Sequence, residues 1–385
     1  MSTDEKRKAY KDWFDAAAAD SLARQIAAVH PKFPRKAFLG LALTNIDALG
    51  FHARVEQFSR ALQATLPEDT PTALAILTES LPPVLPDTEA VTDGWLQWPV
   101  GHFIGAQGLP HFEEAMVAIR ELTRRFTSEF AIRPFIAAHP EKALARLLEW
   151  TTDTCPHVRR LCSEGSRPRL PWGAHLVALI ADPSPALPIL DALKDDPSLY
   201  VRRSVSNHLN DIARDHPAAA LSIAKAWSRR ATAERQWVIR RGLRNLIKAG
   251  DQSALTLLGY APPEGIQTVF EVLPGEISVG ESVRIRLTLE NTGTAPVRLL
   301  LDYAVTYVRR VARTGRKVFK WTTEELQPGQ RKTLEKSHPM RPTSVRALYP
   351  GKHYVEIQIN GVSLERAVFQ LNDGTRPLPP TQNPS

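Results

Sequence analysis

The 385-residue chain contains little sulfur, with only two cysteines and three methionines. The two cysteines, Cys155 and Cys162, lie on one predicted helical stretch. They cannot build a disulfide framework, and their rarity favours a reducing compartment. They bracket His157, but no second cluster of metal-ligand side chains lies nearby in the sequence, so we expect no metal site.

Long apolar runs and the common catalytic motifs are also missing. No segment approaches the apolar length needed to cross a membrane, and the N-terminal residues lack the apolar core of a signal peptide. There is no glycine-rich phosphate loop and no nucleophile elbow. We therefore expect a cytoplasmic protein without membrane attachment or cofactor, in which any catalysis depends on carboxylates.

Positive charge is present in excess but is unevenly placed. The formal net charge is +8. Residues 1–154 carry 16 basic and 20 acidic residues, residues 155–251 carry 16 and 9, and residues 263–372 carry 16 and 11. The positive field therefore lies on the later part of the chain, which favours a polyanionic partner over a merely solvated basic surface.

In three predicted helices between residues 156 and 248, two adjacent arginines directly follow an apolar residue, and these arginine pairs recur 43 and then 38 residues apart. This period is typical of two-helix solenoids of the HEAT type, in which each unit buries its apolar face by stacking on its neighbours. Matching positions then line up along one wall, and the natural partner of aligned arginines is a phosphate backbone. The three motifs are Val158-Arg159-Arg160, Val201-Arg202-Arg203 and Val238-Ile239-Arg240-Arg241. We predict phosphate contacts for Arg160, Arg167, Arg169, Arg202, Arg203, Arg240, Arg241 and Arg244.

The pattern changes from helical to alternating at Ala261-Pro262-Pro263. Turn signals such as Asn291-Thr292-Gly293 and Asn360-Gly361 separate the later apolar runs. About seven short strands over this length fit an immunoglobulin-like sandwich. The predicted fold class is mainly α: a HEAT-like helical-repeat solenoid over 1–258, a β-sandwich over 264–372 and a disordered proline-rich tail over 373–385. The later helices are predicted at 140–151, 156–163, 173–181, 185–194, 198–214, 217–228, 232–248 and 252–258, and the clearest strands at 268–272, 282–290, 297–306, 318–322 and 353–359.

Glu164 occupies an unfavourable position for an acid, at the end of the predicted helix 156–163, where the helix dipole disfavours an anion. It could be an exposed glutamate paired with Arg160 or Arg167. It could also be a carboxylate at the groove wall, since the next loop carries Trp172 behind two prolines. Trp172 itself could staple the following helix or present its face to a cation.

Asp211 and Glu129 are the other candidate acids. Asp211 lies within a predicted helix, where aspartate is a poor helix former, and it shares a face with Arg203 and Asn207. A surface aspartate is one interpretation, and an inward carboxylate that stabilises positive charge is the other. Glu129 would fall in the first turn of a helix capped near residues 127–128, where an acid is favoured for structural reasons alone.

Six basic residues cluster around the predicted turn Thr314-Gly315. Charged residues protect sheet edges, but this density without an acid exceeds what edge protection needs. We therefore favour phosphate contact, with Arg313, Arg316 and Lys317 as the selected contacts. The cluster consists of Arg309, Arg310, Arg313, Arg316, Lys317 and Lys320.

Three long segments, 126–135, 163–172 and 200–213, resemble the AlkC branch of the AlkC/AlkD superfamily of HEAT-like DNA alkylation repair proteins. The resemblance implies a monofunctional DNA glycosylase of base excision repair. It would remove small cationic methylated bases, chiefly 3-methyladenine, without flipping the base into a deep pocket. It implies that Glu164 and Asp211 are the principal catalytic carboxylates, that Glu129 is a third acid at the lesion, and that Trp172 presses against the deoxyribose.

The residue types agree with that chemistry. An N3-methylated adenine is already positively charged, so it leaves as a neutral base without a general acid, and positive charge develops on the sugar. Fixed carboxylates stabilise that charge and can orient water. The expected partner is double-stranded DNA containing alkylated bases, bound by a monomer. The alternative is a non-catalytic HEAT-repeat scaffold that binds nucleic acid or an acidic protein.

Overall fold

The computed structural model describes residues 9–308, 314–343 and 347–373, and the chain divides into two compact units, Met1–Gly242 and Leu243–Ser385. The described part of the first unit is helical, and that of the second unit begins with two short helices and continues as strands. The helices of the first unit are α1 (Ala16–Val29), α2 (Arg35–Ala42), α3 (Phe51–Thr65), α4 (Thr70–Glu79), α5 (Trp98–Gln107), α6 (Phe112–Thr123), α7 (Arg133–Ala138), α8 (Pro140–Glu149), α9 (Pro156–Gly165), α10 (Val177–Ala181), α11 (Leu187–Leu193), α12 (Leu199–Asp215), α13 (Pro217–Ser228) and α14 (Ala233–Gly242).

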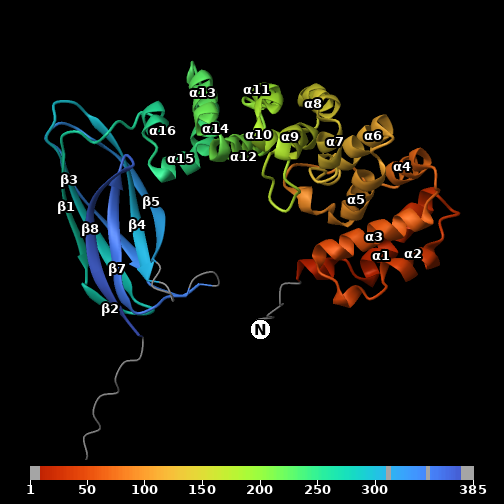
Figure 1. Ribbon diagram of the computed structural model, residues 1–385, viewed down its shortest axis with the longest axis horizontal. Helices are drawn as coiled ribbons and strands as arrows, with labels where there is room; N and C mark the ends of the chain where they lie inside the picture. Colours follow the sequence, from red (N-terminus) through yellow and green to blue (C-terminus); the bar gives the residue numbers. More distant parts are fainter. Residues whose placement is uncertain (1–8, 309–313, 344–346, 374–385) are drawn as a thin grey trace, which may run out of the picture. The chain divides into compact units, whose positions relative to one another are not determined.

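The later helices of the first unit stack in two layers. Figure 1 shows α9, α12 and α14 in one layer and α8, α11 and α13 in the other. The long helix α12 packs against both α9 and α14. Its residues Val201, Val205 and Leu209 are fully buried at a spacing of one helical turn, so a continuous apolar stripe faces the neighbouring helices. This stacking of successive helix pairs confirms the predicted solenoid.

Two ion pairs join α6 to the loop before α9 and α9 to the loop before α12. Arg120 on α6 binds Asp153 ahead of α9, with 2.6 Å between Nη2 and Oδ2. Arg159 on α9 binds Asp196 ahead of α12 through Nε and Nη2, at 2.6 and 3.1 Å. Arg202 on α12 donates through Nη1 to the backbone oxygens of Asp196 and the following proline, at 2.6 and 2.9 Å. The structure therefore gives Arg202 a role in anchoring this loop, and its phosphate contact stays a prediction.

The second unit starts earlier than the predicted boundary at residue 258, because α15 (Arg244–Ala249) and α16 (Gln252–Leu257) pack with the strands. Leu255 on α16 and Tyr260 form a small buried cluster with Leu300 of strand β4. The Gln252 side chain also donates to the backbone oxygen of Asn360, at 3.1 Å. Apolar burial thus assigns these helices to the β unit although their sequence pattern is helical.

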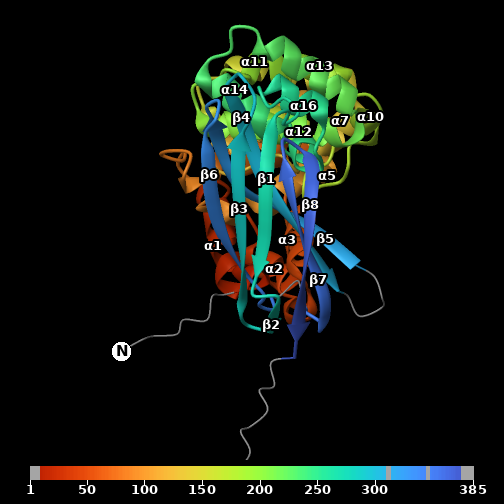
Figure 2. The same cartoon turned by 90° about the vertical axis from the view of Figure 1, so that its left-hand side faces the viewer.

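The strands form two sheets, with the orders β1-β3-β6 and β2-β8-β7-β4-β5 (Figure 2). Alternation along β3 buries Val283, Ile285 and Leu287 against Leu301 and Val305 of β4 in a shared core. All pairings between the strands are antiparallel except that of the short β2 with β8. The predicted two-sheet sandwich is confirmed. The strands are β1 (Ile266–Leu273), β2 (Glu276–Ser278), β3 (Ser282–Asn291), β4 (Val297–Val308), β5 (Thr314–Leu326), β6 (Arg331–Pro339), β7 (Gly351–Ile359) and β8 (Val362–Asn372).

A membrane span is not found among the described residues, since none of their helices combines the length and apolar character that a span requires. Apart from Asp373, the predicted disordered tail at 373–385 lies outside the described residues.

Candidate active site

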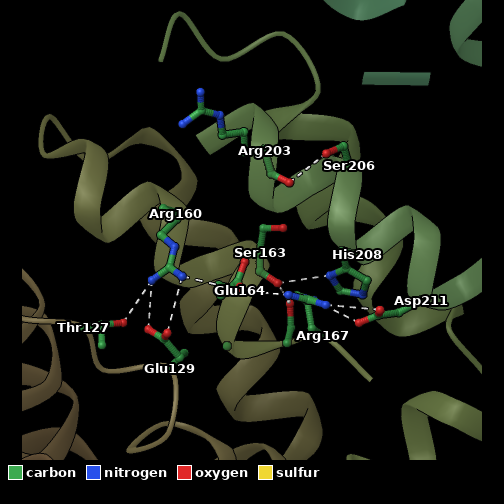
Figure 3. A network of polar contacts seen from close by, with 12 residues as sticks. Thr127, Glu129, Arg160, Ser163, Glu164, Arg167, Arg203, Ser206, His208 and Asp211 are labelled. Carbon is green, nitrogen blue, oxygen red and sulfur yellow. Dashed lines mark hydrogen bonds and ion pairs between the residues drawn. The ribbon is translucent and has the colours of Figure 1, made fainter. Parts of the chain in front are cut away.

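Five charged side chains form a row in which carboxylates and guanidiniums alternate (Figure 3). Glu129 lies in the turn before α7, and Arg160 and Glu164 lie on α9. Arg167 follows directly after α9, and Asp211 lies on α12. The packing of α9 against α12 therefore brings together acids that are far apart in the sequence.

The row is continuous. Arg160 binds both oxygens of Glu129, with Nη1 to Oε2 at 2.9 Å and Nη2 to Oε1 at 3.3 Å. The same Nη2 lies 3.6 Å from Oε1 of Glu164, and Nη1 of Arg167 donates to this Oε1 at 2.7 Å. Arg167 then donates through Nε and Nη2 to the two oxygens of Asp211, at 2.9 and 3.2 Å.

All three carboxylates of the row are buried: the exposed fractions are 7% for Glu129, 6% for Glu164 and 8% for Asp211. A buried carboxylate is costly unless a cation and hydrogen bonds compensate it, which explains the interleaved guanidiniums. Three carboxylates are paired with only two guanidiniums, so the ion-paired row itself carries one excess negative charge, which the neighbouring buried Arg133 cation partly offsets. The row can therefore stabilise an additional positive charge placed beside it.

The pKa values differ along the row. Burial alone would raise the pKa of Glu164, but the guanidiniums of Arg160 and Arg167 outweigh burial and hold the pKa below its ordinary value. For Asp211, burial raises the pKa above its ordinary value, although hydrogen bonds from Arg167 act in the opposite direction. Glu164 is therefore a carboxylate at neutral pH and is unsuited to act as a general acid, whereas the charge on Asp211 depends on its partner.

The structure combines the two interpretations of Glu164, which is paired with both Arg160 and Arg167 and is also buried. Asp211 points inward as one of its interpretations required, but its partner is Arg167. The side chain of Arg203 extends away from the row (Figure 3). The helix expected to begin near residues 127–128 instead begins at Arg133, so Glu129 lies in a turn. Thr127 Oγ1 accepts from Arg160 at 2.9 Å, so it does not cap a helix.

Arg133 holds the loop after α9 and was not identified from the sequence. Its Nη1 donates to the backbone oxygens of Gly165 and Arg167, at 3.0 and 2.9 Å, and its Nε donates to that of Ala174, at 2.7 Å. The side chain is 3% exposed, and burial followed by the Arg167 cation lowers the pKa of Arg133 to about 10. Nothing in the sequence around Arg133 indicates these contacts, because all of them go to backbone oxygens far along the chain.

Trp172 lies at the exposed tip of this loop. Its side chain is 68% exposed and its φ is 65°, a left-handed conformation that costs energy for any residue except glycine. The indole meets the His52 ring edge to face, 6.2 Å between centroids. Together with Trp98 and Phe130, it lines a cleft of about 410 Å³. A strained and exposed aromatic at a cleft is typical of a residue kept for binding.

The arginines predicted to contact phosphates differ in the partners that the structure gives them. Arg160 and Arg167 are engaged in the row, and Arg169 binds both oxygens of Asp215, at 2.6 and 2.9 Å. Arg203 is exposed. Arg240 and Arg241 lie in the last turn of α14, where the Arg241 guanidinium stacks over the Trp237 ring at 5.4 Å, and Arg244 begins α15 in the second unit.

The basic cluster of the β unit is only partly described, since Arg309, Arg310 and Arg313 lie outside the described residues. The predicted turn at Thr314-Gly315 is instead the start of β5, where these residues pair with Val308 and Tyr307. Among the selected contacts, Arg316 binds Glu356 at 2.8 Å, and Lys317 lies 5.3 Å from the centroid of the Phe319 ring.

No group of three or more histidine, cysteine, aspartate or glutamate side chains able to hold a metal occurs in residues 9–308, 314–343 and 347–373. The three carboxylates of the charged row form ion pairs with guanidiniums. The donor set of the row therefore fits charge stabilisation better than metal binding.

Comparisons with known proteins agree with this architecture. A family model described as "Uncharacterised protein YhaZ, C-terminal Ig-like domain" matches residues 267–373. The uncharacterized protein YhaZ of Bacillus subtilis is 34% identical over 94% of this chain and 99% of its own length. The solved structure of the alkylpurine DNA glycosylase AlkC of Pseudomonas fluorescens, bound to DNA containing an abasic site analog, has a TM-score of 0.86 and 36% identity. That match covers 95% of this chain and all of that one. At this identity over nearly the whole chain, the protein belongs to the family of YhaZ and AlkC.

Proposed function

We propose that the protein is a DNA glycosylase of alkylation repair. It would hydrolyse the N-glycosidic bond of small cationic methylated bases, chiefly 3-methyladenine. The observation that carries this proposal is the buried row with its one excess negative charge. Membership in the family of AlkC, whose solved structure holds DNA with an abasic site analog, supports the same reaction, because an abasic site is what a glycosylase leaves behind.

The row suits a substrate whose leaving group needs no proton. A methylated base that is already cationic departs as a neutral molecule, and the deoxyribose takes up positive charge in the transition state. Carboxylates fixed beside the sugar stabilise that charge without reorganising, and one of them can orient the attacking water. An uncharged base would need a general acid. The lowered pKa of Glu164 leaves that carboxyl unable to serve as one.

The remaining predicted residues have complementary parts in this proposal. The exposed indole of Trp172 would press against the deoxyribose and attract its developing charge. Arg203, Arg240 and Arg241 would contact phosphates in the helical unit, and Arg244, Arg316 and Lys317 would do so in the β unit. The duplex would be bound by a monomer in the cytoplasm, and the base would be cut without being flipped into a deep pocket.

Methylated DNA tests the proposal directly. Incubation with the protein, followed by chromatography of the released bases, should yield 3-methyladenine. We expect Glu164→Gln and Asp211→Asn to bind lesion DNA normally but to lose about 10²- to 10³-fold in excision rate, as on removal of a charge-stabilising group. A wild-type protein that releases no base would leave only the nucleic-acid-binding scaffold. A variant that cuts at the normal rate would remove its residue from the mechanism.

A further inference from the structure

Arg167 lies between two carboxylates that come from different helices. Its Nη1 donates to Glu164 on α9 at 2.7 Å, and its Nε and Nη2 donate to the two oxygens of Asp211 on α12 at 2.9 and 3.2 Å (Figure 3). Its exposed fraction is 6%. A guanidinium has its donors in a rigid planar fork, so this one contact fixes the directions of both carboxylates.

The backbone of Arg167 is itself held in place. Its N–H donates to the backbone oxygen of Glu164 at 3.3 Å, and its backbone oxygen accepts from Nη1 of Arg133 at 2.9 Å. The guanidinium is therefore placed by a loop anchored at both ends. Arg167 is thus not a freely moving surface side chain.

The two carboxylates depend on Arg167 to different degrees. Glu164 has a second guanidinium nearby, with Nη2 of Arg160 at 3.6 Å. Asp211 has Arg167 as its ion-pair partner, helped by the backbone N–H of Arg169. Loss of the Arg167 guanidinium would therefore affect the ionisation and direction of Asp211 more than those of Glu164.

We propose that Arg167 is a positioning residue, whose guanidinium joins Glu164 to Asp211 and holds both carboxylates in the directions needed to face a cationic sugar. This inference rests on the proposed function and replaces the phosphate contact expected from the sequence. A phosphate could gain these donors only by displacing one of the two buried carboxylates, which would leave that carboxylate without its partner.

The test is Arg167→Gln, which removes the cation, beside Arg167→Lys, which keeps a cation but cannot reach both carboxylates in a planar fork. Arg159→Gln is the matched control. It breaks a two-point arginine–aspartate pair made by α9, the helix that carries Glu164, but touches neither Glu164 nor Asp211. Two readouts are needed: the titration midpoint of the Asp211 carboxyl by carbon-13 NMR, assigned with Asp211→Asn, and the pH profile of excision of 3-methyladenine.

We expect Arg167→Gln to move the Asp211 midpoint to higher pH, because burial is then opposed only by the Arg133 and Arg169 cations, which do not ion-pair with Asp211. The acid limb of the excision profile should move in the same direction, and the plateau rate should fall about 10- to 100-fold through misplacement. Arg167→Lys should move the midpoint less but recover little of the rate. Arg159→Gln should leave the midpoint and the acid limb in place, even if it lowers stability.

An unmoved Asp211 midpoint in Arg167→Gln would overturn the proposal. So would a normal excision rate combined with weaker DNA binding, which would make Arg167 a phosphate contact after all. If Arg167→Gln does not fold, the same two readouts on Arg167→Lys decide. A wild-type protein that releases no base would refute the proposed function, whereas the NMR midpoint still decides whether Arg167 governs the Asp211 carboxylate.

Discussion

Each charged side chain of the buried row is paired with a partner of opposite charge, whereas Trp172 is an apolar side chain left in solvent. The loop exposes a large apolar ring and holds it at a φ of 65°, which costs about 1 kcal/mol for a residue other than glycine. Packing does not explain this, because most of the ring is in solvent. A side chain kept at a loss of stability is expected to contribute to function.

Trp172→Gly therefore separates stability from activity. We expect the free energy of unfolding to rise by about 1 kcal/mol, since glycine adopts positive φ without strain and little packing is lost. The urea midpoint should move to higher concentration accordingly. Excision of 3-methyladenine should fall, because the indole no longer contacts the deoxyribose. The control is Trp172→Ala, which also removes the ring but keeps the strain, and so should lose activity without gaining stability. Normal excision by both variants would remove Trp172 from the active site.

At the level of the elements, the sequence was most informative where burial follows a periodic pattern. The helix predicted at 217–228 coincides with α13, and that predicted at 198–214 differs from α12 by one residue at each end. The helix predicted at 173–181 begins only at Val177, because Arg133 holds the preceding residues in a loop. Strand β6 shows no clear alternation of apolar and polar residues in the sequence, since nearly all its side chains are at least partly exposed. Local patterns cannot reveal such long-range contacts.

The acids of the candidate active site show the same limit of local sequence patterns. A glutamate at a helix end and an aspartate within a helix are visible as anomalies, and both proved to be buried. Their common partner was not visible, because Arg167 and Asp211 are 44 residues apart and meet only through the packing of α9 on α12. The sequence pattern does not distinguish the arginines within each pair. In the structure, Arg159 ties one repeat to the next, Arg202 anchors the loop before its own helix and Arg160 belongs to the row, which leaves Arg203 for DNA.

The Arg159–Asp196 pair between repeats predicts that substitutions of two adjacent aspartates in the loop before α12 differ in their effect on stability. Asp196 is 6% exposed and binds Arg159, whereas the side chain of Asp195 is 40% exposed and binds Arg235. We expect Asp196→Ala to destabilise the helical unit by about 3 kcal/mol, because Arg159, whose side chain is 14% exposed, loses its buried carboxylate partner. Asp195→Ala should cost less than about 1 kcal/mol, as exposed pairs do. Urea unfolding followed by helical circular dichroism measures both, and equal losses would contradict the proposed link between repeats.

For the whole molecule, charges of opposite sign serve different parts of the proposed reaction. Residues 155–251 carry 16 basic and 9 acidic residues, which attracts a polyanion. The row joins Glu129 from the acidic N-terminal part to four residues of this segment and so keeps an excess negative charge, which would repel phosphate but stabilise a cationic sugar. The guanidiniums that compensate the buried acids are unavailable to the duplex, so DNA affinity should depend on the basic side chains outside the row.

Arg203 is the clearest of these, since its side chain is exposed and extends away from the row (Figure 3). We expect Arg203→Ala to weaken binding to a duplex with an abasic site analog and to reduce the slope of log affinity against log salt by about one, as for the loss of one phosphate contact. The matched control is Arg24→Ala, which removes the same charge from a side chain 63% exposed on α1, in the acidic part of the chain. Fluorescence anisotropy titrations from low to moderate salt measure both slopes. Equal slopes for Arg203→Ala and the wild type would show that the duplex does not follow this face of α12, and a reduced slope for Arg24→Ala would place it on the N-terminal helices instead.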